Sequence, residues 1–155
     1  ERVIADALSL AEHFADGDKI VVILGDNVIE KSIKKYVKRF QMQPQGARIL
    51  IKKVPDPWRF GVVELEGKRI ISIEEKPRKP KSNYIVTGIY MYDNQVFDII
   101  RTLKPSQRQE FEITDVNNAY LKKGQLYYDI LDGFWTDCGT FESLLMANNL
   151  VAKKE

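Results

Sequence analysis

Short β-branched runs alternate with amphipathic segments along the first half of this chain, and this alternation restricts the fold more than any other feature. The longest apolar run, residues 20–24, has the length of a strand buried on both faces. Residues 31–42 then carry apolar side chains at helical spacing, and residues 47–54 have the composition of a second strand. A strand, a helix and a strand in this order predict a crossover between parallel strands, and therefore an α/β protein.

The middle of the chain has a different pattern. Residues 61–65 and 69–74 are short β-prone runs separated by Glu66-Gly67-Lys68, which predicts an antiparallel hairpin. Residues 84–92 form the most β-prone stretch, and Gly88 in its interior is typical of a bulge or of a place where a ligand approaches the backbone closely. The remaining expected elements are helices at residues 2–15, 95–103, 113–123 and following the capping residue Thr140, and a strand within residues 125–135.

Composition excludes several classes of protein. With 155 residues, of which 44% are hydrophobic and 30% charged, we expect one domain over residues 1–155 with a core of its own. The single cysteine, Cys138, and the single histidine, His13, exclude an internal disulfide and a Cys/His zinc cluster, so a cytoplasmic location is expected. The formal charge is only +2, and no apolar run approaches the roughly 20 residues of a membrane span, so we expect neither nucleic acid nor membrane as a partner.

Polar motifs end three of the predicted strands. Asp26 follows the first strand and Asp137 follows a later one, so the two would meet at one sheet edge if these strands are parallel, as a suitable ligand pair for Mg²⁺. In Glu74-Glu75-Lys76-Pro77, a carboxylate can accept hydrogen bonds from sugar hydroxyls and the ammonium can hold a phosphate. Each motif also has an ordinary interpretation, as a turn, a helix entry or a solvated strand end.

Taken in order, these segments resemble the sugar-1-phosphate nucleotidylyltransferases, and most closely their thymidylyltransferase branch. The resemblance covers nearly the whole chain and is carried by residues 24–27, 56–64, 74–77, 80–84, 86–90, 112–117 and 135–140. It implies a Rossmann-like nucleotidyltransferase fold, incomplete at the N-terminus. In that fold a mostly parallel central sheet is flanked by helices and carries an antiparallel β excursion.

The resemblance also implies an activity. In that activity a nucleotidyl group passes from dTTP to glucose 1-phosphate, giving dTDP-glucose and pyrophosphate; UTP is the closest rival donor. Asp26 and Asp137 would be catalytic residues that carry Mg²⁺, and Lys76 would be a catalytic residue that holds the sugar phosphate. The substrate-binding residues implied by the resemblance are Gly61, Glu75, Lys76, Thr87, Gly88 and Tyr90.

One signature of that family is missing from the sequence. The family's nucleotide loop contains Gly-x-Gly, but none of the nine glycines here lies two residues from another. We therefore expect this chain to be the sugar-phosphate-binding portion of a longer enzyme, which needs the preceding segment for catalysis. The alternative is a non-catalytic relative that binds the sugar phosphate. Since members of the family are commonly tetrameric, a homo-oligomer is also expected.

Overall fold

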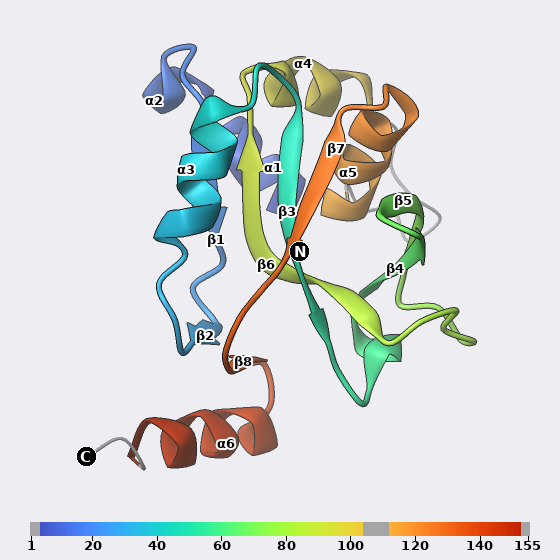
Figure 1. Cartoon of the computed structure of the whole chain (residues 1–155). Helices are drawn as coiled ribbons and strands as arrows, with labels where there is room; N and C mark the ends of the chain where they lie inside the picture. The colour runs from blue at the N-terminus through green and yellow to red at the C-terminus, as the bar shows by residue number, and fades with distance from the viewer. Residues whose placement is uncertain (1–3, 104–111, 153–155) are drawn as a thin grey trace.

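The computed structural model describes residues 4–103 and 112–152. Six strands form one sheet in the order β5-β4-β6-β3-β7, with β1 paired to β6, and two short strands pair separately (Figure 1). The strands are β1 (Ile20–Ile23), β2 (Asn27–Ile29), β3 (Ala47–Lys53), β4 (Gly61–Glu66), β5 (Arg69–Glu75), β6 (Tyr84–Tyr92), β7 (Leu126–Ile130) and β8 (Trp135–Asp137). The helices are α1 (Ile4–Ser9), α2 (Glu12–Ala15), α3 (Lys34–Met42), the 3-10 turn η1 (Pro57–Arg59), α4 (Gln95–Thr102), α5 (Ile113–Lys122) and α6 (Phe141–Ala152).

Strand β6 is the centre of the sheet and is buried almost along its whole length. Because successive side chains of a strand point to opposite faces, β6 contributes to two cores. Tyr90 and Tyr92 pack into the core beneath α1, α4 and α5, whereas Ile89 and Met91 pack into the core beneath α3. The molecule is therefore layered, with helices on both faces of the sheet (Figure 1).

The α/β class is as predicted, and so is the antiparallel β4–β5 hairpin. Strands β1, β3, β4 and β7 share one direction, yet among the described residues only β3 and β7 pair in parallel. The two strands of the predicted crossover unit, β1 and β3, run the same way but are separated by β6, which pairs with both in antiparallel fashion. A strand from later in the chain has thus inserted between them.

Strand β1 is less buried than its sequence predicts. We expected a strand covered on both faces, but Val21 is 40% exposed and Ile23 is 51% exposed. Within the described ranges β1 pairs only with β6, and only alternate side chains of β1 reach the core. The continuous apolar run therefore indicated a strand correctly but did not indicate how it is covered.

The predicted N-terminal helix over residues 2–15 is divided into α1 and α2. The Ser9 hydroxyl donates to the Asp6 carbonyl at 2.6 Å, a side-chain bond that competes with continued helix. Phe14, one of the residues that defined the helical spacing, is 91% exposed.

The last helix, α6, begins after Thr140 as predicted, since the Thr140 hydroxyl accepts a hydrogen bond from the Ser143 N–H at 3.1 Å. This helix stands apart from the sheet (Figure 1), and its apolar residues Phe141 and Leu145 are exposed. No helix within the described ranges is both long enough and apolar enough to cross a membrane.

Candidate functional site

A cavity of about 260 Å³ lies where the β1–β2 turn, the start of β4, the end of β5, the middle of β6 and the end of β8 meet. Its lining contains every residue predicted for the site except Thr87. The predicted residues that line it are Asp26, Gly61, Glu75, Lys76, Gly88, Tyr90 and Asp137. Segments more than 100 residues apart in the sequence thus converge on one hollow.

Thr87 lies on the opposite side of β6. Its hydroxyl donates to the Leu50 carbonyl at 2.8 Å, and the residue is 1% exposed. Because side chains alternate along a strand, Gly88 and Tyr90 can face the cavity only if Thr87 faces away from them. The structure therefore does not bring the Thr87 side chain to the site.

Asp26 and Asp137 reach the cavity by a route that the sequence did not indicate. We expected two parallel strands ending at one edge, but β2 and β8 form an antiparallel pair in which Asn27 lies opposite Asp137. The Cys138 N–H also donates to the Asp26 carbonyl at 2.8 Å. Asp137 consequently lies at the end of this small ladder, and Asp26 lies in the turn directly before it.

Each of these carboxylates has a partner from the protein. Asp26 Oδ1 accepts a hydrogen bond from Asn27 Nδ2 at 2.8 Å, and Asp137 Oδ2 lies 3.1 Å from Arg59 Nη2. Arg59 also pairs with Asp56 at 2.9 Å and so connects η1 to the end of β8. Arg59 was not among the predicted site residues, although its segment carried part of the family resemblance.

Glu75 is held in place from α5. The Thr114 hydroxyl, on a residue only 4% exposed, donates to Glu75 Oε2 at 2.6 Å. Gly61 lies opposite Glu75 in the β4–β5 ladder, and a Cβ added to it would be 3.2 Å from both Glu75 Oε2 and Thr114 Oγ1. A side chain at position 61 would therefore press on this hydrogen bond. Thr114 is a second residue that sequence reasoning did not assign to the site.

Lys76 has a backbone conformation that is rare outside glycine, with φ of 44°. Its N–H donates to the Phe60 carbonyl at 3.0 Å, and Pro77 follows it directly. Such a conformation costs of order 1–3 kcal/mol and persists only where the surroundings impose it. Strain of this kind at a cavity wall is typical of functional sites.

Tyr90 lies at the buried side of the cavity and is 4% exposed. Burial raises the pKa of its hydroxyl well above the ordinary value, and the nearby charges of Glu75 and Asp26 raise it further. The phenol is therefore neutral at physiological pH and can act as a hydrogen-bond donor beside two carboxylates.

The donor set at this cavity suits a hard divalent cation. Asp26 and Asp137 both line the cavity and offer carboxylate oxygens, whereas no cluster of three or more His, Cys, Asp or Glu suited to a metal occurs in residues 4–103 and 112–152. Mg²⁺ commonly binds one or two carboxylates and takes its other ligands from water and substrate phosphates. The residues present therefore fit Mg²⁺ better than a metal that needs an all-protein cage.

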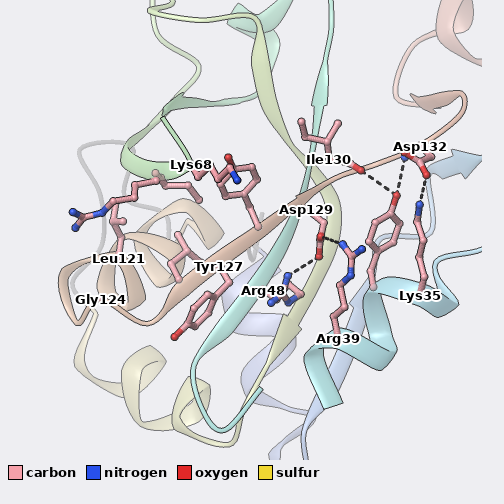
Figure 2. Close-up of a pocket in the computed structure, with 15 residues that line it drawn as sticks. Lys35, Arg39, Arg48, Lys68, Leu121, Gly124, Tyr127, Asp129, Ile130 and Asp132 are labelled. Atoms are coloured by element: carbon pink, nitrogen blue, oxygen red, sulfur yellow. Dashed lines mark hydrogen bonds and ion pairs between the residues drawn. The ribbon is translucent and has the colours of Figure 1, made fainter. Parts of the chain in front are cut away.

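A larger hollow of about 880 Å³ lies beside β7 and contains none of the predicted site residues (Figure 2). Its acidic groups are already paired with its basic ones. Arg48 Nη1 lies 2.6 Å from Asp129 Oδ2, and the Asp129 carboxylate also contacts Arg39. Lys35 forms an ion pair with Asp132. The smaller cavity is therefore the candidate site, because it gathers the carboxylates and the lysine whose chemistry the sequence predicts.

The family described as nucleotidyl transferase matches residues 1–154, and the chain belongs to this family. Among curated relatives, the glucose-1-phosphate thymidylyltransferase of Neisseria meningitidis serogroup A is 44% identical over 152 residues, which are 96% of this chain and 53% of the relative. The corresponding protein of Mycobacterium tuberculosis is 42% identical over 98% of this chain and 54% of its own length. The chain thus spans about half the length of the curated relatives it matches.

Solved structures agree with this assignment. A structure from Bacillus anthracis, described as a glucose-1-phosphate thymidylyltransferase in complex with a sucrose, superposes with a TM-score of 0.90 at 54% identity and covers 95% of this chain and 60% of that one. A UDP-glucose pyrophosphorylase complexed with UDP-glucose superposes with a TM-score of 0.87 at 26% identity, over 99% of this chain and 63% of that one. The fold is therefore the nucleotidyltransferase fold.

Proposed function

We propose that this chain forms the sugar-phosphate and metal side of a site that transfers a thymidylyl group from dTTP to glucose 1-phosphate. The observation that carries this proposal is the gathering of Asp26, Asp137, Glu75 and Lys76 around one cavity. The names of the relatives support the choice of sugar and donor. The B. anthracis thymidylyltransferase is 54% identical to this chain, whereas the UDP-glucose pyrophosphorylase is 26% identical.

In the proposed reaction an oxygen of the sugar phosphate attacks the α-phosphorus of dTTP. A phosphorus–oxygen bond forms as the bond to pyrophosphate breaks, so dTDP-glucose and pyrophosphate are the products. Both reactants are polyanions that repel one another. The protein must therefore supply positive charge and alignment, which are the main requirements of phosphoryl chemistry.

Lys76 and Glu75 would divide the recognition of glucose 1-phosphate between them. Glu75 has one oxygen occupied by Thr114, and its remaining acceptor capacity suits sugar hydroxyls. Tyr90 can add a donor, and Gly61 and Gly88 line the cavity without side chains of their own.

Asp26 and Asp137 would hold Mg²⁺, which when bound neutralises charge on the phosphates. Arg59, already in contact with Asp137, adds a positive charge to the same cavity. We also propose a cytoplasmic location, since donor and acceptor are small water-soluble metabolites, and a homo-oligomeric assembly in line with the family resemblance.

The test combines calorimetry of glucose 1-phosphate binding to this chain with pyrophosphate release by the protein that contains it. We expect the binding of glucose 1-phosphate to require Lys76. We expect the release of pyrophosphate to be faster with dTTP than with UTP. Faster release with UTP would favour the uridylyltransferase alternative. Binding of the sugar phosphate without any release of pyrophosphate would favour the non-catalytic relative, and absence of binding would contradict the proposal altogether.

A further inference from the structure

The side chain of Asn27 connects three parts of the cavity. Its Oδ1 accepts hydrogen bonds from Trp135 Nε1 at 2.7 Å and from the Gly88 N–H at 3.0 Å. Its Nδ2 donates to Asp26 Oδ1 at 2.8 Å. One carboxamide thus links the β1–β2 turn to the middle of β6 and to the start of β8.

Gly88 lies so close to the Asn27 carboxamide that position 88 has no room for a side chain. A Cβ added at Gly88 would lie 2.3 Å from Asn27 Nδ2 and 2.8 Å from Asn27 Cγ, which is closer than real Cβ contacts occur. From the sequence, this mid-strand glycine was expected to mark either a bulge or the close approach of a ligand. The structure shows that the group nearest to it is Asn27, so the glycine is required by a neighbour within the protein.

From these contacts we infer that Asn27 is a positioning residue, which fixes the direction of the Asp26 carboxylate and its spacing from Asp137. The inference rests on the proposed function, in which those two carboxylates share a divalent cation. Asn27 lies opposite Asp137 in the β2–β8 ladder, and the Trp135 bond holds the same strand two residues away. It therefore contacts the Asp26 carboxylate directly, and it contacts the strand that carries Asp137 through Trp135.

The chemistry of the site requires an amide at position 27. Two N–H donors face Oδ1, so an acceptor is needed there, and Asp26 needs a donor. Only an amide side chain offers both on one short stem. A hydroxyl would be too short to reach three partners, and a carboxylate would place a second negative charge against Asp26.

The test uses the protein that contains this chain, and it measures Mn²⁺ binding by calorimetry in the presence of glucose 1-phosphate, together with kcat and KM for pyrophosphate release. We expect Asn27→Ala to weaken Mn²⁺ binding about tenfold or more and to lower kcat by a similar factor, with KM for glucose 1-phosphate within about twofold. The matched control is Asn118→Ala, because Asn118 is another asparagine with a tertiary hydrogen bond, donated from Nδ2 to the Ile73 carbonyl at 3.0 Å, but it does not line this cavity. The control should keep the wild-type Mn²⁺ affinity.

The second variant is Gly88→Ala, which places a methyl group against the same Asn27 carboxamide. We expect it to lower both the unfolding midpoint and the Mn²⁺ affinity, and we expect the double variant with Asn27→Ala to recover the midpoint but not the affinity. Wild-type Mn²⁺ affinity in folded Asn27→Ala, or in Gly88→Ala, would overturn the inference. Failure of the wild-type protein itself to bind Mn²⁺ or to release pyrophosphate would instead overturn the proposed function, and the inference with it.

Discussion

Lys76 combines two properties that rarely occur together, a left-handed backbone and a charged side chain at a cavity. Glycine adopts φ of 44° without a Cβ penalty, whereas lysine pays about 1–2 kcal/mol for it. The ammonium is the only part of the side chain that the proposed reaction needs. The strain is consistent with a position that is kept for its charge and not for its conformation.

This gives a prediction that separates charge from conformation. Lys76→Gly should raise the free energy of unfolding by about 1 kcal/mol, whereas Lys76→Ala should not, because alanine keeps the strained φ. Both variants should bind glucose 1-phosphate about tenfold more weakly or worse, since both lose a charge-assisted hydrogen bond. Urea denaturation and calorimetry measure the two effects. Equal stabilities of the glycine and alanine variants would show that the backbone at position 76 is not strained.

At the scale of elements, the three-residue pair of β2 and β8 determines where the carboxylates lie. Strand β8 reaches β2 because the chain turns after β7 at Gly133, whose φ is 73°. A Cβ there would lie 2.9 Å from Glu30 Oε2 and 3.0 Å from Lys31 Cγ. The link between β7 and β8 is therefore sensitive to a single methyl group.

We predict that Gly133→Ala lowers the free energy of unfolding by about 1–2 kcal/mol and weakens Mn²⁺ binding several-fold, because the turn that places Asp137 must shift. Gly67 offers a matched control, since its φ is 59° and the space around it is open. Gly67→Ala should cost about 1 kcal/mol for the same conformational reason and leave Mn²⁺ affinity unchanged. Denaturation and calorimetry on the two variants test this, and equal effects on Mn²⁺ would refute the role of the turn.

The elements also show what the sequence can and cannot predict. Residues 84–92 form a strand with the predicted boundaries, because their β-branched and aromatic composition is a local property. The insertion of β6 between β1 and β3 is a pairing between distant segments, for which local patterns carry no information. For the same reason Asp26 and Asp137 could be named in advance, while the antiparallel ladder that joins them could not.

The residues of the site also fall into two groups, those predicted from a local motif and those whose role depends on tertiary contacts. Glu75 and Lys76 were predicted from a local motif and its resemblance, and both line the cavity. Asn27, Arg59 and Thr114 lie in segments that carried the resemblance, but their importance depends on tertiary hydrogen bonds that no spacing rule reports. The Thr87 side chain bonds to the Leu50 carbonyl and does not face the cavity, because the phase of β6 relative to the cavity depends on the whole sheet.

At the scale of the whole molecule, three tyrosines lie in the core beneath α1, α4 and α5. Tyr90 stacks on Tyr92 with ring centroids 6.0 Å apart, and Tyr92 stacks on Tyr120 at 5.8 Å. Burial raises the pKa of all three hydroxyls, and the hydrogen bond from Tyr120 to Asp93 raises that of Tyr120 further. These groups make folding stability dependent on pH in the alkaline range.

The direction of this pH dependence is set by whether the folded or the unfolded state releases its tyrosine protons at lower pH. The unfolded chain loses tyrosine protons near pH about 10, whereas the folded protein keeps them, so the free energy of unfolding falls as pH rises above about 10. Each tyrosine contributes up to about 1.4 kcal/mol per pH unit. Tyr90→Phe should therefore flatten the decline by about that amount, as measured by denaturation at several alkaline pH values. A decline of the same slope in this variant would show that Tyr90 ionises in the folded state as readily as in the unfolded chain.

The central claim is that Asp26 and Asp137 hold one divalent cation beside Lys76. The most direct measurement is the stoichiometry of Mn²⁺ binding, by electron paramagnetic resonance with glucose 1-phosphate present, in the wild type, Asp26→Asn and Asp137→Asn. Asp132→Asn serves as the control, because Asp132 lines the hollow beside β7 and not this cavity. We predict a single bound Mn²⁺ in the wild type and the control and none in the two site variants, and retention of the bound ion in either site variant would contradict the account.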